Sequence, residues 1–309
     1  MITVIIPTRN PHAGRLARTL EGLREQSLPR SDWELVVVDN GSTPPLSTAA
    51  FPGLAGLTAR IVVALVAGLT VARLAGIQAS RGDILVFVDD DNVLDPDYLS
   101  SVAQRFAASP TLGAAGGPVI PEWETPPPEW THEFHGLLAL RNLGPAPRVA
   151  RGMPAAPWPP FAPVGAGLAI RRTFATAYAE VVDRDSQRLS LDRAGRSLAS
   201  GGDNDLVFTA LHAGGDVAYF PELRVRHLIP ASRLHPEYLA AINRGIMRTW
   251  VRVLALHGHN PWPAIPRWTV PLRAARAWLR RRAWTYPAAR VRWAGDLGQF
   301  EGQADVHHP

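Results

Sequence analysis

The chain has 309 residues, of which 46% are hydrophobic and 19% charged, so it can bury a large core and wholesale disorder is excluded. Cysteine is absent, which excludes disulfides, thiolate metal sites and a cysteine nucleophile. The net charge is +5, but residues 240–309 carry +8 and the remainder −3, so the basic character belongs to the tail and does not indicate a nucleic-acid partner.

Strand and helix patterns alternate through the first third of the chain. Short β-branched or apolar runs predict strands at residues 3–7, 34–38, 60–66 and 83–88. Apolar positions at helical spacing predict helices at residues 14–26 and 71–79. This alternation predicts a mostly parallel sheet covered by helices on both faces.

The middle and the end of the chain differ from this pattern. Residues 118–163 contain twelve prolines, so little regular structure and a functional loop are expected there. Beyond it, a helix is expected at residues 205–212, followed by strands at residues 217–220 and 223–229. From about residue 236 the sequence predicts helices, interrupted around residues 258–266.

Three successive acids, Asp89, Asp90 and Asp91, directly follow an apolar strand. In a parallel sheet, ligands bind beyond the carboxyl ends of the strands. Adjacent carboxylates repel each other unless a cation or solvent relieves them, and oxygen ligands suit Mg²⁺ or Mn²⁺ together with substrate phosphates. The run therefore favours a metal–phosphate site over the alternative of a solvated turn.

Two further aspartates follow strand or turn patterns, and each allows two interpretations. Asp39 ends the second predicted strand, where it can accept a hydrogen bond from a base or ribose, or form an Asx turn before Gly41. Asp203 precedes a predicted helix, where it can act as a general base or cap the helix. The two roles of Asp203 are compatible.

A histidine and an arginine are weaker candidates. His227 shares one face of its predicted strand with Leu223, Val225 and Ile229, which fits a core histidine better than a metal ligand. Arg73 can pair with phosphates, although an arginine is more often simply solvated.

The C-terminal tail is rich in arginine and tryptophan. Leu272, Ala275 and Leu279 form one stripe of a predicted helix that also carries five arginines, and six of the ten tryptophans lie beyond residue 240. This composition suits an anionic membrane surface. Alternatively, the apolar stripe packs on the body of the protein.

Several of these segments follow one another in an order that resembles family 2 glycosyltransferases with the GT-A fold, of the bacterial surface-glycan type. The segments are Pro7-Thr8-Arg9-Asn10, Val38-Asp39-Asn40-Gly41, Ala72-Arg73, Asp89-Asp90-Asp91, Gly202-Asp203-Asn204-Asp205 and Val225-Arg226-His227. The resemblance covers roughly residues 1–235. It implies an α/β fold, a GT-A-like single domain with a mostly parallel central sheet flanked by helices, followed by a C-terminal helical appendage.

The resemblance also implies roles on the donor side. Asp91 would bind a divalent metal, Mn²⁺ or Mg²⁺, with Asp89 and His227 as further ligands. A nucleoside-diphosphate sugar would be bound by these nucleotide-site residues: Pro7, Thr8, Arg9, Asp39, Arg73, Asp89 and Asp90. Leu74 stands where the family usually has asparagine after the arginine, so the match of that loop is incomplete.

On the acceptor side, the resemblance implies that Asp203 is the catalytic base. Asp205 would support the acceptor site, and Gly165 and Gly167 would let the backbone approach a sugar. Trp123, in the proline-rich loop, would shape the acceptor site. Gly202 stands where the family usually has glutamate, so any acceptor contact of that glutamate is lost or replaced.

The sequence is therefore interpreted as a metal-dependent inverting glycosyltransferase that acts on a glycan or lipid-linked acceptor. Residues 1–117 are expected to bind the donor, residues 118–235 to hold the acceptor and catalytic groups, and residues 236–309 to form the Arg/Trp-rich helical region. The expected location is cytoplasmic, or peripheral at the inner face of the cell membrane, because residues 1–7 resemble no signal peptide and no apolar run is long enough to span a bilayer.

Two other functions compete with this interpretation. A sugar-phosphate nucleotidyltransferase can share nucleotide–metal geometry, but no glycine-rich basic loop for a triphosphate occurs near the N-terminus. A non-catalytic module docked on a membrane or nucleic acid through the tail would have no need of Asp89, Asp91 and Asp203.

Overall fold

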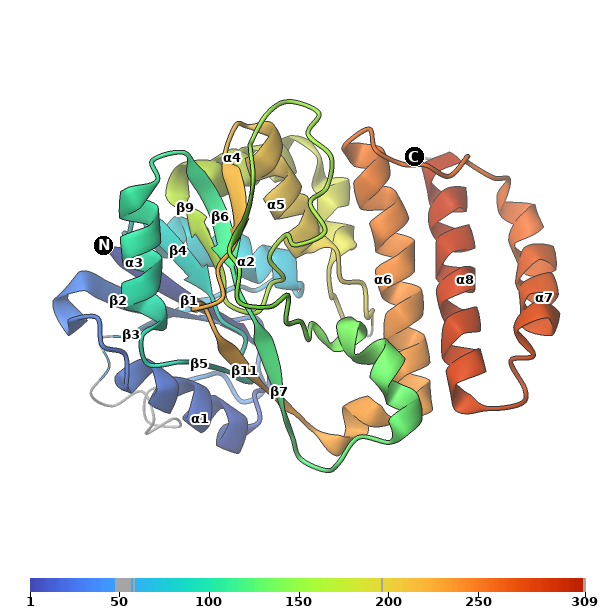
Figure 1. Ribbon diagram of the computed structural model, residues 1–309, viewed down its shortest axis with the longest axis horizontal. Coiled ribbons are helices and arrows are strands. Elements are labelled where there is room, and N and C mark those ends of the chain that lie inside the picture. Colours follow the sequence, from blue (N-terminus) through green and yellow to red (C-terminus); the bar gives the residue numbers. More distant parts are fainter. Residues whose placement is uncertain (48–56, 58, 196, 308–309) are drawn as a thin grey trace. The chain divides into compact units, whose positions relative to one another are not determined.

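The computed structural model in Figure 1 describes residues 1–47, 57, 59–195 and 197–307. The strands are β1 (Ile2–Thr8), β2 (Trp33–Asp39), β3 (Ala59–Val63), β4 (Ile84–Phe87), β5 (Asn92–Leu94), β6 (Leu112–Gly116), β7 (Val119–Trp123), β8 (Arg148–Ala150), β9 (Leu168–Arg171), β10 (Asp216–Tyr219) and β11 (Val225–Ile229). The helices are α1 (Ala13–Arg24), α2 (Leu69–Ala79), α3 (Tyr98–Ala108), α4 (Arg172–Arg184), α5 (Gly202–His212), α6 (Pro236–Leu256), α7 (Val270–Arg281) and α8 (Pro287–His307). The pattern of alternating strands and helices expected for the first third is confirmed.

The chain divides into two compact units. Unit 1 comprises residues 1–122, 139–186 and 206–228, and unit 2 comprises residues 123–138, 187–205 and 229–309. Helix α5 starts in unit 2 and continues in unit 1. The division by function into residues 1–117, 118–235 and 236–309 stays a prediction.

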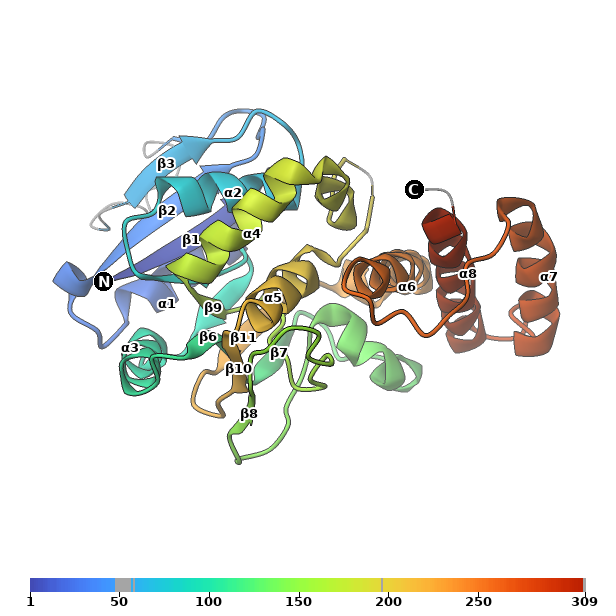
Figure 2. The same ribbon diagram turned by 90° about the horizontal axis from the view of Figure 1, so that it is seen from above.

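Unit 1 is built on a mixed sheet that, within the described residues, has eight strands in the order β3-β2-β1-β4-β9-β6-β10-β8. Strands β1, β2, β3 and β4 are parallel, whereas β9 runs antiparallel between β4 and β6. Helices α2 and α4 lie side by side over the sheet (Figure 2). The mostly parallel sheet predicted from the sequence is confirmed.

Both faces of β1 are buried, which explains its unbroken apolar sequence. Val4 and Ile6 belong to the same core cluster as apolar side chains of α1 and α3. Ile5 points to the other face, where a Cβ on Gly76 of α2 would lie 2.4 Å from its Cγ2. Glycine at 76 therefore lets α2 approach the sheet closely.

A smaller sheet, with strands in the order β5-β11-β7, contains part of the proline-rich stretch. Strand β7 includes Pro121, which it tolerates because β7 is an edge strand. A 3₁₀ helix also forms at Glu129–Leu138. The expectation of little regular structure in residues 118–163 is thus too strong: an edge strand needs fewer backbone donors than a central one, so proline does not prevent it.

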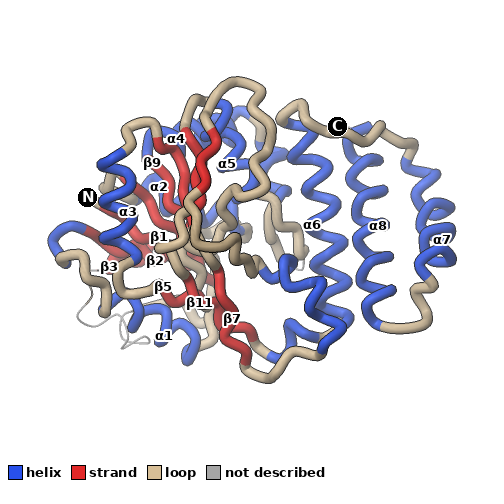
Figure 3. The backbone as a smooth tube through the Cα atoms, in the orientation of Figure 1, coloured by secondary structure: helices blue, strands red, loops and turns tan. Residues whose placement is uncertain are grey.

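Unit 2 contains α6, α7 and α8, with α8 between the other two (Figures 1 and 3). Helices α6 and α8 pack closely because α8 presents glycines to α6: a Cβ on Gly298 would lie 2.1 Å from the Arg244 carbonyl oxygen. Arg248 also pairs with Asp305, with 2.7 Å between Nε and Oδ2. The predicted helical C-terminal region, interrupted after residue 256, is confirmed.

Candidate active site

The carboxyl ends of β1, β2 and β4 meet at one edge of the large sheet. Thr8 at the end of β1 is in register with Asp39 at the end of β2, and Ile5 is in register with Phe87 at the end of β4. The acidic run that follows β4 therefore continues beside the last residues of β1. The Thr8 hydroxyl donates a hydrogen bond to the Asp90 carboxylate there. Strand register thus brings together donor-side residues that are up to 82 positions apart in sequence.

Asp39 is only 1% exposed, yet its carboxylate is well satisfied. It accepts hydrogen bonds from the backbone N–H of Ser42 at 2.8 Å and of Leu46 at 2.9 Å. Burial by itself raises the pKa of Asp39, but the hydrogen bonds from Leu46 and Ser42 outweigh it and hold the pKa below its usual value. The Asp39 carboxylate thus holds the turn after β2 through the N–H of Ser42, three residues on, rather than that of Gly41 as in an Asx turn. Its contact with a nucleotide stays a prediction.

The Asp39 carboxylate is expected to make stability depend on pH. Because its pKa is lower in the folded than in the unfolded state, the stabilisation is present above the unfolded pKa and is lost as pH falls through the folded pKa. Asp39→Asn should lower the free energy of unfolding at neutral pH by about 1–3 kcal/mol. It should also flatten the loss of stability between about pH 5 and pH 2.

The measurement is urea unfolding across that pH range. Asp183→Asn, which changes an exposed aspartate on α4, is the matched control. If Asp39→Asn and wild type lost stability in parallel as the pH was lowered, the hydrogen bonds to Asp39 would not be the source of the acid sensitivity.

Two asparagines, Asn10 and Asn40, fix the loops around this edge, and neither was predicted from the sequence to be functional. The Asn40 side chain donates to the carbonyl oxygens of Ala64 and Val66 and accepts from the N–H of Gly68, at 3.1, 2.7 and 2.7 Å. Asn10 has a left-handed backbone, with φ of 50°, and accepts from the N–H of Thr43 at 2.7 Å. Both could have been recognised by position, because Asn40 directly follows β2 and Asn10 comes two residues after β1.

Asp91 and His227 form a buried pair in unit 1. Their side chains are 5% and 6% exposed, and 3.4 Å separates Asp91 Oδ1 from His227 Nε2. Strand pairing explains the meeting: β5 and β11 are antiparallel, with Asn92 opposite His227, and the N–H of Leu228 donates to the Asp91 carbonyl at 2.9 Å. Asn92 also donates to Asp91 Oδ1 at 3.2 Å.

This pair fits a divalent cation. A carboxylate oxygen and an imidazole nitrogen are suitable ligands, and a cation in a nucleotide site usually completes its shell with substrate phosphates and water. Among the residues that the structure describes, no group of three or more His, Asp and Glu side chains could hold a metal by itself. The protein would thus supply part of the coordination shell.

The other donor-side residues lie in the same unit. Pro7 is buried at the end of β1, Arg9 is exposed just beyond it, and Asp89 is half-buried. Arg73 on α2 is 5% exposed, with its guanidinium carbon 6.0 Å from the centre of the Phe87 ring. The interpretation of Arg73 as a solvated surface residue is therefore wrong, because the side chain is packed under the end of β4.

Gly167 is required by the core of unit 1. Its φ is +74°, and a Cβ there would lie 2.7 Å from Val225 Cγ2 and 2.8 Å from the Tyr98 hydroxyl oxygen. Tyr98 also donates a hydrogen bond to the Gly167 carbonyl. Packing alone thus explains glycine at 167, and an approach of Gly165 and Gly167 to a sugar stays a prediction.

In unit 2, Asp205 holds the first turn of α5 in place. Its carboxylate is fully buried and is hydrogen-bonded by Arg188 and, at 2.8 Å, by Nε2 of His257. Neither partner was identified from the sequence, because they lie 17 and 52 positions away without a local motif. Asp203 lies inside this first turn rather than preceding the helix.

Asp203 and Asp205 point in different directions although they are only two residues apart. Residues at i and i+2 of a helix lie on opposite sides, so burial of Asp205 turns Asp203 away from the anchored side. Asp203 is half-buried, and one of its oxygens accepts from the N–H of Asn204 at 3.0 Å. The first turn therefore offers a carboxylate from a fixed backbone.

Trp123 lies in an aromatic group of unit 2. Its ring centre is 4.9 Å from that of His135, which in turn is 5.2 Å from His132. Burial and, to a smaller extent, the electrostatic interaction with His132 lower the pKa of His135. The half-buried indole of Trp123 thus packs against the His135 ring.

Comparison with known proteins decides the family. Residues 3–175 match the model of the family described as glycosyl transferase family 2. The chain belongs to this family. Together with relatives named as glycosyltransferases, this identifies the chain as a glycosyltransferase and confirms the resemblance seen in its motifs.

Sequence alignments between this family 2 glycosyltransferase and its relatives cover different fractions of the chain. Succinoglycan biosynthesis protein ExoM of Rhizobium meliloti is 28% identical over 275 residues, which are 85% of this chain and 77% of the relative. Pre-mycofactocin glycosyltransferase of Mycobacterium tuberculosis is 26% identical over 288 residues, 90% of this chain and 52% of the relative. Validoxylamine A glucosyltransferase of Streptomyces hygroscopicus is 31% identical over 156 residues, 48% of this chain and 36% of the relative.

A solved structure supports the fold. This family 2 glycosyltransferase superposes on the crystal structure of S. aureus TarS 1-349 with a TM-score of 0.52 and 13% sequence identity. The match covers 99% of this chain and 90% of the TarS chain. This similarity confirms the predicted GT-A-like α/β fold. No helix in the described part of the chain combines the length and the apolarity needed to cross a bilayer.

Proposed function

We propose that this protein is a metal-dependent inverting glycosyltransferase that moves a sugar from a nucleoside-diphosphate sugar to a hydroxyl acceptor. The observation that carries the proposal is the buried Asp91–His227 pair, 3.4 Å apart, directly after β4. The end of β4 is also where the Asp90 carboxylate meets Thr8 of β1. An acidic edge of this kind is suited to a cation and a diphosphate.

The donor would be held by residues of unit 1. Asp39 would accept a hydrogen bond from the base, and Asp89 and Asp90 would contact the ribose or the metal. Arg73, Pro7, Thr8 and Arg9 would complete the nucleotide site. A bound Mg²⁺ or Mn²⁺, held by Asp91, His227 and Asp89, would neutralise negative charge on the departing nucleoside diphosphate.

The acceptor would be activated by a residue of unit 2. Asp203 would take the proton from the acceptor hydroxyl as that oxygen attacks the anomeric carbon on the face opposite the diphosphate, which inverts the configuration. Asp205 would keep the first turn of α5 in position through Arg188 and His257. Trp123 would offer an apolar face to a sugar ring, and Gly165 and Gly167 would let the backbone approach a sugar.

The proposed acceptor is a glycan or a lipid-linked glycan for the cell surface or for export. The relationship to a succinoglycan biosynthesis protein over 85% of the chain supports this class. A lipid-linked acceptor would place the protein in the cytoplasm, peripheral at the inner face of the membrane, with the Arg/Trp-rich C-terminal region against an anionic surface. No nucleic-acid partner is proposed.

A panel of UDP, GDP, dTDP and CDP, each with and without Mn²⁺, tests the donor site by thermal shift. A nucleotide at about 100 times its dissociation constant should stabilise the fold by about 2.7 kcal/mol, visible as a raised midpoint. One nucleotide is expected to act, and only with the metal. Equal shifts with and without Mn²⁺ would contradict the metal site, and stabilisation by a nucleoside triphosphate with a sugar phosphate would favour a nucleotidyltransferase.

A further inference from the structure

Helix α7 packs on α8 through one of its two faces. On that face, Ala277 is buried, and the Trp278 ring meets the Trp293 ring edge-on, with 4.8 Å between their centres. Trp293 also donates through Nε1 to the carbonyl oxygen of Ala274 at 3.0 Å. These contacts satisfy the inward side of α7.

The opposite side of α7 is apolar as well, but it faces outward. Leu272 and Leu279 are 66% and 65% exposed. They are seven residues apart, so they lie on the same side of the helix. Ala274, Ala277 and Trp278 lie on the roughly opposite side of the helix axis. The stripe predicted from the sequence therefore exists, but the alternative that it packs on the body is wrong: other residues of α7 make that contact.

Large aromatic side chains extend this apolar surface at both ends of α7. Trp268 before the helix is 73% exposed, and Trp284 and Tyr286 after it are 57% and 52% exposed. We call the five side chains Trp268, Leu272, Leu279, Trp284 and Tyr286 the α7 surface. Soluble proteins usually expose large apolar side chains singly, whereas these five lie within one segment, residues 268–286.

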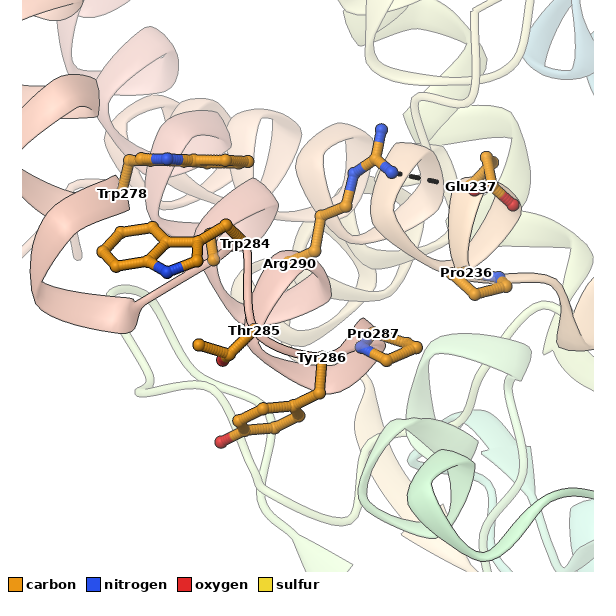
Figure 4. Close-up of a pocket in the computed structure, with 9 residues that line it drawn as sticks. Pro236, Glu237, Trp278, Trp284, Thr285, Tyr286, Pro287 and Arg290 are labelled. Atoms are coloured by element: carbon orange, nitrogen blue, oxygen red, sulfur yellow. Dashed lines mark ion pairs between the residues drawn. The ribbon is translucent and has the colours of Figure 1, made fainter.

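A hollow of about 350 Å³ adjoins the α7 surface at the turn into α8. Figure 4 shows the indole rings of Trp278 and Trp284 at one side of it, and Arg290 pointing toward Glu237 at the other. Arg290 Nη1 and Glu237 Oε1 are 3.7 Å apart. The hollow thus combines aromatic walls with a charged rim.

The chain segment that carries the α7 surface has charged side chains of one sign. Residues 267–290 contain seven arginines and neither aspartate nor glutamate. Arg280 and Arg281 pair with Asp296, but within the described residues the structure records no ion pair for Arg273, Arg276 or Arg282, all exposed. On the helix, Arg276 lies beside the Leu272–Leu279 stripe, with Arg273 and Arg280 next to it.

We propose that the α7 surface binds an anionic phospholipid membrane, with α7 lying in the plane of the interface. Its leucines would enter the acyl boundary, and its tryptophans and tyrosine would lie at headgroup level, where such amphipathic rings collect. Long arginine side chains can cover apolar surface while their guanidinium groups reach lipid phosphates.

The inference deepens the peripheral location proposed above, and it does not rest on the donor chemistry. Vesicle binding and nucleotide binding are separate measurements on the same full-length chain. A protein that bound vesicles without binding a nucleotide would keep this inference and lose the proposed mechanism. The reverse result would keep the mechanism and overturn the inference.

The test is co-sedimentation with vesicles of phosphatidylcholine alone and with about one third phosphatidylglycerol, at about 0.05 M and 0.5 M salt. Wild type should bind the anionic vesicles at low salt and the neutral ones far more weakly. The triple variant Arg273→Gln/Arg276→Gln/Arg282→Asn should partition into the anionic vesicles roughly 100-fold more weakly than wild type at low salt. Asparagine is chosen at 282 because that residue has a left-handed backbone, with φ of 50°.

Loss of the apolar stripe provides the second arm. Leu272→Ser/Leu279→Ser should weaken vesicle binding about tenfold or more at both salt concentrations, because each leucine loses its buried apolar area. The matched controls Val149→Ser and Arg151→Gln change exposed residues of unit 1 and should bind like wild type. Circular dichroism checks that each variant is folded.

Several outcomes would overturn the inference. They are equal binding to neutral and anionic vesicles, wild-type binding by the double-serine variant, and DNA binding without vesicle binding. Sedimentation equilibrium that showed a dimer dissociated by Leu272→Ser/Leu279→Ser, without vesicle binding, would make the α7 surface a subunit interface instead.

Discussion

Asp203→Asn is expected to lower kcat about 1,000-fold, because it removes the proposed general base while keeping the shape of the side chain. The amide oxygen can still accept the hydrogen bond from the N–H of Asn204, so the first turn of α5 should remain intact. The dissociation constant of the nucleotide–metal complex should not change. Initial rates with donor and acceptor both varied separate the effect on kcat from that on KM.

Two companion variants make this result interpretable. Asp183→Asn makes the same chemical change at an exposed position of α4 and should leave kcat unchanged. His257→Ala removes one hydrogen bond from Asp205, so it should loosen the turn and lower kcat less than Asp203→Asn does. The assignment of Asp203 as base would be refuted if Asp203→Asn kept more than about a tenth of the wild-type kcat.

Asp91→Ala is expected to abolish metal-dependent turnover, with a loss of at least about 1,000-fold, because it removes the proposed metal ligand and, with the metal, the charge neutralisation of the leaving group. The stabilisation by nucleotide with Mn²⁺ should disappear at the same time. Asp91→Asn removes the negative charge and keeps nearly the same side-chain shape beside Asn92 and His227. It should show the same loss of turnover, and its fold should stay intact. Isothermal titration with Mn²⁺ and nucleotide is the direct measurement.

His227→Ala should weaken Mn²⁺ binding less than Asp91→Ala, since the proposed imidazole ligand brings no negative charge to the cation, whereas the proposed carboxylate ligand does. Asp97→Asn, exposed at the start of α3, is the control for loss of a nearby carboxylate. Full activity of Asp91→Asn in the presence of a chelator would show that the Asp91–His227 pair serves the fold alone.

The order of secondary structure was predictable because it depends on local patterns. The apolar run of β1 and the helical spacing in α1 are contained in a few neighbouring residues, and both elements form within a residue or two of the predicted bounds. Strand β7 was not predicted, because proline in an edge strand becomes acceptable only once its neighbour β11 is known.

The candidate site was predictable in its aspartates and not in the groups that hold them. Asp39, Asp91 and Asp203 follow or begin regular elements, and that position can be recognised in the sequence. Asp91 meets His227, which is 136 positions away. Asp205 anchors the turn that carries Asp203, and it is held by Arg188 and His257, which are 17 and 52 positions away. No local pattern encodes such distances.

The sequence by itself determined the family, the alternating architecture and the acids at the strand ends, because motif order and periodicity are properties of neighbouring residues. Only the tertiary structure decided that Asp205 is buried by Arg188 and His257, and that the Leu272–Leu279 stripe faces outward. A helical pattern gives the relative directions of side chains around one axis. Which direction is buried depends on the partner, and α7 uses its alanine and tryptophan face for α8.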